Sequence, residues 1–276
     1  MFKRVIVPID GSDESARALR PASAIARWLG KPMEVIAFHR PDASADDLQR
    51  LVTHQVAEAG DVQRTIEVRP AEVTVGESIA EVAGRAADGL IVMSTRGGGR
   101  SSALVGSVAT EVLAATHAPV MLIGPKCDVG RIRLHGPMVV PVGMDESGAG
   151  LDLAAELAAE FGYRPVVANV VDPATSRELA RARSGPGGGD MAPESAMAGR
   201  HAKQVEKALG SGEIDYEVLH DDKPDRAITA LAKDVDATLI TMTTAARSGL
   251  GRLRAGSVTG KVVAHSTCPV IAVAPT

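Results

Sequence analysis

The sequence Ser94-Thr-Arg-Gly97, followed after eight residues by Gly106-Ser-Val108, decides how this chain is organised. A related stretch reads Thr243-Thr-Ala-Ala246 and continues, after nine residues, with Gly256-Ser-Val258. Each stretch follows an apolar run, and each is followed about ten residues later by a Pro-Val pair that opens another apolar run. One loop design therefore occurs twice, at the same place in two copies of one unit.

The loop has a composition that suits a phosphate group. Small residues after a strand let the backbone approach a ligand closely. Gly-Ser at a helix start offers amide N–H groups, a hydroxyl and the positive end of a helix dipole. The same pair is also an ordinary helix start, so a capping role is the alternative interpretation. The candidates for phosphate binding are Gly106, Ser107, Val108, Gly256, Ser257 and Val258.

The two copies open on similar apolar runs, Arg4-Val-Ile-Val-Pro-Ile-Asp10 and Met138-Val-Val-Pro-Val-Gly-Met-Asp145. We align Asp10 with Asp145, an offset of 135, and the two Gly-Ser pairs at an offset of 150. The difference of 15 indicates an insertion in the second copy, most simply within residues 172–200. The predicted domains are residues 1–126 and 137–276, with the linker at 126–137.

Short apolar runs alternate with amphipathic stretches in each copy. This pattern predicts an α/β fold of two tandem, doubly wound, parallel five-stranded sheets of the Rossmann-like type. The predicted strands are 4–9, 33–38, 64–69, 89–93 and 119–123, then 138–143, 165–171, 214–219, 237–242 and 269–274. The predicted helices are 13–29, 45–59, 77–87 and 106–116, then 148–161, 192–209, 224–233 and 256–265.

Composition narrows the class of protein. A length of 276 residues is typical of two domains, and 45% apolar but only 2% aromatic residues predict cores of Val, Ile, Leu and Ala. A net charge of −4, mixed along the chain, argues against a nucleic-acid binder.

No run reaches the roughly 18 apolar residues of a membrane helix, and no signal peptide precedes the first strand, so we expect a cytoplasmic protein without membrane contact. The two cysteines make no disulfide framework and the seven histidines show no metal spacing, so we expect no metal site.

In doubly wound sheets, ligands bind beyond the carboxyl ends of the strands, where the strand order reverses. The residues at these ends are therefore binding candidates. Asp10 and Asp145 have a second interpretation, because an acidic residue there also caps the following helix. The candidates are Pro8, Ile9, Asp10, Arg40, Met93, Ser94 and Gly97 in the first copy, and Asp145, Val170 and Thr243 in the second.

Together these motifs resemble a tandem universal stress protein, with two family domains in one chain. The resemblance rests on the opening run 5–12, the run 90–97 with 106–108, and their relatives in the second copy. It implies a non-enzymatic stress-response protein that responds to ATP, with or without Mg, through the loop after the fourth strand. It also implies that strands 119–123 and 269–274 pair edge to edge as an internal pseudo-dimer, since an unpaired apolar edge is a liability. A homodimer of two chains is a further implied assembly.

The loops depart from the family pattern of Gly, two residues, Gly, nine residues, then Gly and Ser or Thr. The first copy has Ser94 for the first glycine, keeps Gly97, and has a loop one residue short. The second copy has the full length, but Thr243 and Ala246 replace both early glycines. A Cβ where positive φ is needed costs about 1 kcal/mol or more. The hydroxyls of Ser94 and Thr243 are also able to donate to a phosphate.

We expect one nucleotide or none per chain, and we place the one in the first copy because it keeps more of the glycines. The adenine-side position, Arg40 in the first copy and Val170 in the second, favours the second copy instead.

The alternative function is a family scaffold that binds no nucleotide and acts through protein contacts. An enzyme is the third hypothesis. The chain has no P-loop, no Ser-His-Asp arrangement, no paired carboxylates and no G-x-G-x-x-G after the first strand, so we expect no catalytic residues.

Overall fold

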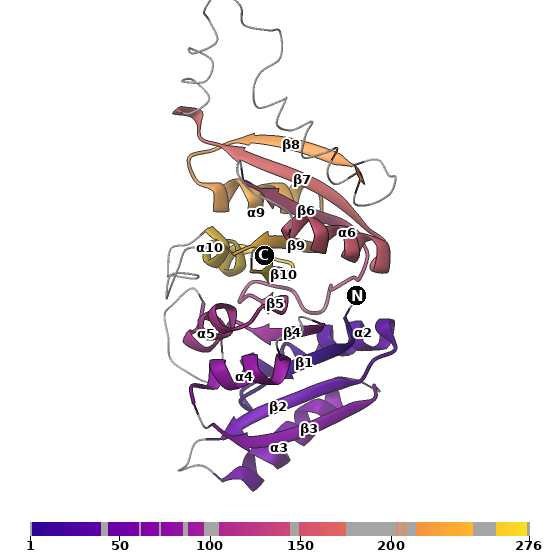
Figure 1. Ribbon diagram of the computed structural model, residues 1–276, viewed down its shortest axis with the longest axis vertical. Helices are drawn as coiled ribbons and strands as arrows, with labels where there is room; N and C mark the ends of the chain where they lie inside the picture. Colours follow the sequence, from indigo (N-terminus) through magenta and orange to yellow (C-terminus); the bar gives the residue numbers. More distant parts are fainter. Residues whose placement is uncertain are drawn as a thin grey trace, which may run out of the picture.

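The computed structural model describes residues 2–39, 44–60, 62–71, 73–84, 88–96, 105–143, 149–174, 203, 206–207, 214–244 and 258–274. These residues form a continuous 10-stranded sheet with helices on both faces (Figure 1). The strand order is β3-β2-β1-β4-β5-β10-β9-β6-β7-β8, so the two copies lie side by side along one sheet. The predicted α/β fold with two parallel five-stranded halves is confirmed.

The elements of the first copy lie close to their predicted positions. The predicted helix 13–29 is divided into two helices, because Pro21 has no amide hydrogen and its ring excludes the helical position of the carbonyl four residues earlier, at Arg17. The bounds are β1 Arg4–Pro8, α1 Asp13–Ala16, α2 Leu19–Leu29, β2 Met33–His39, α3 Ala45–Glu58, β3 Arg64–Pro70, α4 Val75–Ala83, β4 Gly89–Ser94, α5 Ser107–Ala115 and β5 Val120–Ile123.

The second copy repeats this order. The insertion at 172–200 and the predicted helix 192–209 lie almost wholly outside the described residues, although Lys203, Glu206 and Lys207 are helical. The bounds are β6 Gly136–Val142, α6 Ala149–Phe161, β7 Tyr163–Val171, β8 Asp215–His220, α9 Pro224–Asp234, β9 Leu239–Thr243, α10 Val258–His265 and β10 Val270–Val273.

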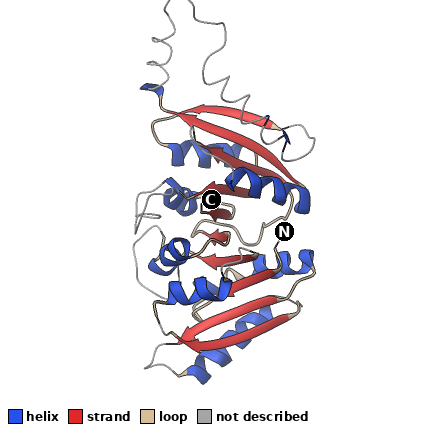
Figure 2. Cartoon of the chain, in the orientation of Figure 1, coloured by secondary structure: helices blue, strands red, loops and turns tan. Residues whose placement is uncertain are grey.

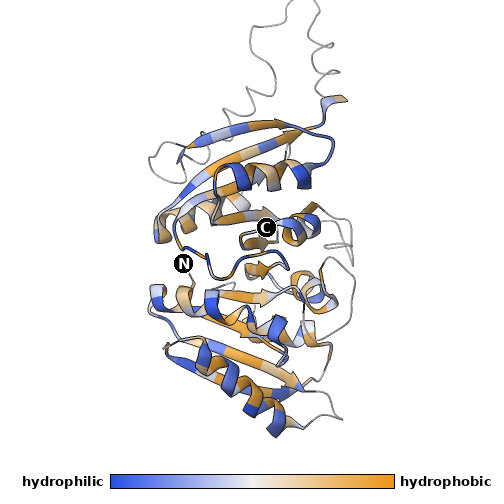
Figure 3. Ribbon diagram, turned by 180° about the vertical axis from the view of Figure 1, so that it is seen from behind, coloured by the Kyte–Doolittle hydropathy of each residue, from blue (hydrophilic) through white to orange (hydrophobic). Residues whose placement is uncertain are grey.

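Strands within each copy are parallel, and the two copies meet through an antiparallel pair at the centre of the sheet. Strands β5 and β10 pair with Leu122 opposite Val270 and Val120 opposite Ala272. The expected edge-to-edge pairing of the two closing strands is therefore present. Burying these two apolar edges against each other leaves β3 and β8 as the outer strands, which have only exposed and half-buried residues. Hydrophilic and hydrophobic residues alternate in part along β8 (Figure 3).

Helices of the two copies cover the sheet in two layers (Figure 2). One core cluster contains buried residues of α2, α3 and α6, and the other contains those of α4, α5, α9 and α10. Both clusters consist mainly of Val, Ile, Leu and Ala, as the composition predicts. Across the described ranges, no helix has the length and apolar character needed to span a bilayer.

Candidate functional site

The candidate site of the first copy lies where the strand order reverses. Strands β1 and β4 are neighbours, with Val5 paired to Leu90, while their connections run to opposite sides of the sheet. The loop after β1 and the loop after β4 therefore begin next to each other, at the place where doubly wound sheets bind ligands. Pro8, Ile9 and Met93 are buried at or near the carboxyl ends of these two strands.

Asp10 organises the loop after β1. One oxygen of its carboxylate, Oδ1, accepts from the amide of Ser12 at 3.0 Å and from the Ser12 hydroxyl at 2.6 Å. Ser12 is the N-cap of α1, and its side chain accepts from the amide of Ser15 at 3.2 Å. Asp10 thus supports the helix start through Ser12, as its alternative interpretation expects, and it is exposed just after the end of β1.

Gly106 closes the loop after β4 onto the end of that strand. Its amide donates to the carbonyl oxygen of Thr95 at 2.8 Å, and a Cβ on Gly106 would lie at 2.8 Å from the same oxygen. Sequence reasoning attributes this glycine to close approach of a ligand. Contact with Thr95 is a sufficient reason for it, so Gly106→Val would disturb the loop as well as any binding.

Helix α5 begins directly at this closure. Gly106 is its N-cap and has no side chain to accept from the first turn. Ser107, the first helical residue, is exposed, and Val108 is half-buried. The earliest amide to be paired within the helix is that of Thr110, which donates to the Gly106 carbonyl at 3.1 Å. The amides of the first turn and the helix dipole therefore suit an anion at this position.

Thr95 is a residue that sequence reasoning missed. It is buried, and its amide donates to the Ile123 carbonyl at 3.1 Å, which ties the end of β4 to the end of β5. Thr244 makes the equivalent bond in the second copy, to the Val273 carbonyl at 2.8 Å. The recurrence of this threonine in both copies is the signal that could have identified it.

The two residues that replace the first family glycine contact the protein itself. Ser94 is 7% exposed, and its hydroxyl accepts from the Arg96 amide at 3.4 Å. The Thr243 hydroxyl lies against Gly150 in the first turn of α6, so closely that a Cβ on Gly150 would overlap it. Gly150 therefore makes room for Thr243, and both hydroxyls have contacts other than a phosphate.

The sheet register corrects the alignment of the two copies. Val5 pairs with Leu90 and Met138 pairs with Leu239, and these two leucines begin the equivalent runs of β4 and β9. The offset on the first strands is therefore 133, not 135, and the counterpart of Asp10 is Gly143. Matching the two aspartates by residue type was wrong, because the second copy has two more residues before its aspartate.

The adenine-side positions need a similar correction. Val5 pairs with Met33 and Met138 pairs with Pro165, so the offset on the second strands is 132. Val170, half-buried in β7, is therefore the counterpart of Phe38, and Asp172 is the counterpart of Arg40.

Five candidates lie outside the described residues: Arg40, Gly97, Asp145, Gly256 and Ser257. Val258 is the first residue of α10.

The two cysteine thiols, which lie elsewhere in the described chain, are buried and unreactive. Burial raises the pKa of the Cys127 thiol to about 12 and also raises the pKa of Cys268, so both thiols stay protonated. Within the described ranges, no group of three or more His, Cys, Asp or Glu side chains is arranged to hold a metal ion.

Comparison with known proteins identifies the family. The fold defines a duplicated α/β domain of the Rossmann-like class. The model of the universal stress protein family matches residues 1–124 and 135–274, and the chain belongs to this family. Family membership supports a role in the stress response.

This chain is also similar to individual proteins and solved structures. A universal stress protein of Thermus aquaticus is 29% identical over 141 residues, which are 45% of this chain and 99% of that protein. The crystal structure of a universal stress protein from Archaeoglobus fulgidus covers 99% of this chain and 96% of its own, with 16% identity and a TM-score of 0.68. A universal stress protein solved in complex with cAMP covers 51% of this chain and 98% of its own, with 22% identity and a TM-score of 0.40.

Proposed function

We propose that this protein is a non-enzymatic stress-response protein whose first copy binds one ATP, with or without Mg. The observation that carries the proposal is the start of α5. There, a helix N-terminus without a side-chain cap, at Gly106 and Ser107, ends the loop after β4, and β4 is the neighbour of the strand that leads to Asp10. Phosphates would bind the first-turn amides, and the nucleoside would extend towards the ends of β1 and β2.

The second copy is proposed to carry no nucleotide. Gly143 stands at the register position of Asp10, and Asp145 follows two residues later, outside the described residues. The Thr243 side chain, at the end of β9, packs on Gly150 of α6. Together with Ala246 in place of the second glycine, these changes favour a domain that supports the first copy rather than one that duplicates its binding.

ATP is proposed to act as a signal and not as a substrate. The Asp10 carboxylate accepts two hydrogen bonds from Ser12, an arrangement that favours support of the loop over proton transfer. Domains 1–126 and 137–276 would act together as an internal pseudo-dimer through β5 and β10. The proposal also includes the association of two chains into a homodimer and a cytoplasmic location of the protein.

A scaffold that binds no nucleotide is the second candidate. It is favoured by Ser94 and Thr243, whose hydroxyls contact Arg96 and Gly150 within the protein. In that case the Gly106 closure and the Ser12 cap would serve folding only, and function would depend on contacts with partner proteins.

Mass spectrometry of the purified and then denatured protein separates these two candidates. We expect ATP or its hydrolysis product AMP at close to one molecule per chain, because purification from cells retains tightly bound nucleotide. Protein that reproducibly carries no nucleotide, and takes up none when incubated with ATP and Mg, would favour the scaffold instead. Turnover of added ATP well above background would contradict the non-enzymatic assignment.

A further inference from the structure

Three of the six aromatic residues of this chain gather at one contact between the copies. The Trp28 ring lies 5.9 Å from Phe161, and Phe161 lies 6.0 Å from Tyr163, measured between ring centroids. Trp28 belongs to α2 of the first copy, whereas Phe161 and Tyr163 belong to α6 and β7 of the second. Such a concentration, in a chain with few aromatic residues, makes this contact a specific feature of the seam between the copies.

The contact includes a hydrogen bond to a helix end. The indole Nε1 of Trp28 donates to the carbonyl oxygen of Glu160 at 3.2 Å. Glu160 lies in the last turn of α6, where carbonyl groups have no partner within the helix. Trp28 therefore caps the C-terminal end of a helix in the other copy, and it does so while remaining 53% exposed.

The contact lies near the approximate two-fold axis that relates the copies. Gly30 and Gly162 follow α2 and α6, with φ of 62° and 72°, and are equivalent at an offset of 132. Trp28 and Glu160 are equivalent at the same offset. A residue that contacts its own counterpart is typical of a two-fold interface. The equivalent helix ends of the two copies thus meet, and only the first copy contributes a tryptophan there.

The beginning of the same helical segment carries the candidate nucleotide loop. Ser12 caps α1 and holds the Asp10 carboxylate. Helix α1 passes directly into α2, because the Ala18 amide donates to Ser15 at 3.2 Å and the Ala22 amide to Ala18 at 3.1 Å. Two short helices joined by these bonds therefore connect Ser12 to Trp28, with the loop at one end and the second copy at the other.

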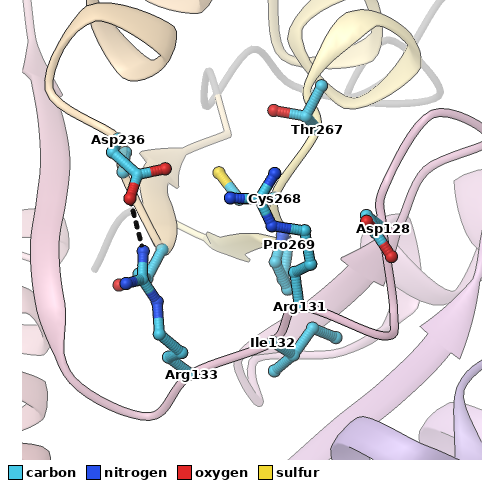
Figure 4. Close-up of a pocket in the computed structure, with 10 residues that line it drawn as sticks. Asp128, Arg131, Ile132, Arg133, Asp236, Thr267, Cys268 and Pro269 are labelled. Atoms are coloured by element: carbon cyan, nitrogen blue, oxygen red, sulfur yellow. Dashed lines mark hydrogen bonds and ion pairs between the residues drawn. The ribbon is translucent and has the colours of Figure 1, made fainter.

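The linker provides a second attachment at this seam. The Arg17 guanidinium donates to the Cys127 carbonyl at 2.6 Å, between α1 and α2. Farther along the linker, the Tyr163 hydroxyl donates to the Arg133 carbonyl at 3.3 Å. Arg133 in turn pairs with Asp236 of the second copy at 2.7 Å, at the edge of a pocket of about 70 Å³ (Figure 4). A shift of α1 and α2 would therefore act on the linker as well as on α6.

We propose that the segment α1–α2 couples the copies: the state of the Asp10 loop in the first copy sets the order of the C-terminal end of α6 in the second. The coupling acts through the Trp28 contact, defined as Trp28, Glu160, Phe161 and Tyr163. The coupling goes beyond nucleotide binding, because it would transmit any movement of the loop, whichever partner or ligand causes that movement. If ATP binds as proposed, the second copy reports the occupancy of the first.

Hydrogen exchange of the full chain, measured on the last turn of α6, tests this coupling without any ligand. Ser12→Ala removes the cap of α1 and one contact of Asp10, and we expect exchange at 158–163 to rise at least about threefold. Asp10→Ala, at an exposed side chain, is the second variant if the first folds poorly. The matched control is Thr74→Ala, which removes the same kind of cap from α4 on the other face of the sheet and leaves exchange in α6 unchanged.

A double variant completes the test. In a Trp28→Leu background, which lacks the bond to Glu160, we expect Ser12→Ala to have no further effect on α6. Unchanged exchange in the Ser12→Ala and Asp10→Ala proteins, or an equal rise with Thr74→Ala, would overturn the coupling. None of these measurements requires nucleotide, so the coupling and the proposed function stand or fall separately.

Discussion

Replacement of Gly124 by alanine is expected to destabilise the protein by about 3 kcal/mol, the upper range for overpacking a well-packed site. Gly124 follows β5 and is buried against α10 of the second copy. A Cβ there would overlap the carbonyl oxygen of Val263, which is backbone and has no rotamer by which to move aside. The adjacent pairing of Leu122 with Val270 prevents the copies from separating locally to relieve the overlap.

Urea unfolding monitored by circular dichroism measures this effect. Gly130→Ala is the matched control, because Gly130 is an exposed linker glycine whose nearest contact is the flexible carboxylate of Asp128 at 3.2 Å. We expect the control to change the free energy of unfolding by less than about 0.5 kcal/mol. Equal midpoints for the two variants would mean that the copies do not pack at this seam as described.

Ser107→Asp is expected to weaken ATP binding at least about a hundredfold while leaving the fold intact. An aspartate in the first turn of α5 interacts favourably with the helix dipole, so stability should stay the same or rise slightly. The same carboxylate repels a phosphate a few ångströms away, at a cost of about 4 kcal/mol for two charges roughly 4 Å apart near a protein surface. Binding and stability therefore change in opposite directions, which a general loss of folding cannot imitate.

Equilibrium dialysis with radiolabelled ATP, together with a thermal melt, measures both quantities. Ser107→Asn supplies nearly the same shape without the charge, and we expect its affinity to stay within about threefold of the parent, since neutral hydrogen bonds are worth about 1 kcal/mol or less. Undiminished binding by Ser107→Asp would remove the start of α5 from the site.

Much of this fold can be read from the sequence because its signals are local. The apolar runs predict all ten strands to within a few residues, and Gly30 ends α2 as expected. The order of the runs predicts the doubly wound halves. The division between α1 and α2 was missed, although Pro21 carries the signal, because the apolar periodicity continues across the break.

The register between strands could not be read in the same way. An aspartate after an apolar run invites alignment with another aspartate, and only the pairing of Val5 with Leu90 and of Met138 with Leu239 shows that Gly143 is the counterpart of Asp10. Contacts between distant residues were equally hidden. Nothing in the sequence near Thr243 indicates that Gly150 makes room for it, since 93 positions separate the two residues.

The candidate site was therefore predicted at the level of loops rather than of individual interactions. The loops after β1 and β4 do lie together at the reversal of strand order. The reason for Gly106 was only half anticipated, because its closest neighbour is the Thr95 carbonyl. The residues that surround Gly97 and Gly256 lie outside the described chain, so their part in the site stays a prediction.

Isothermal titration of the full chain with ATP and Mg tests the central claim most directly. The account predicts one site per chain, retained in Ser257→Asp and lost in Ser107→Asp, since only the first copy keeps both the aspartate and the second glycine of the motif. Two equivalent sites, or a single site that is lost in Ser257→Asp and retained in Ser107→Asp, would contradict it.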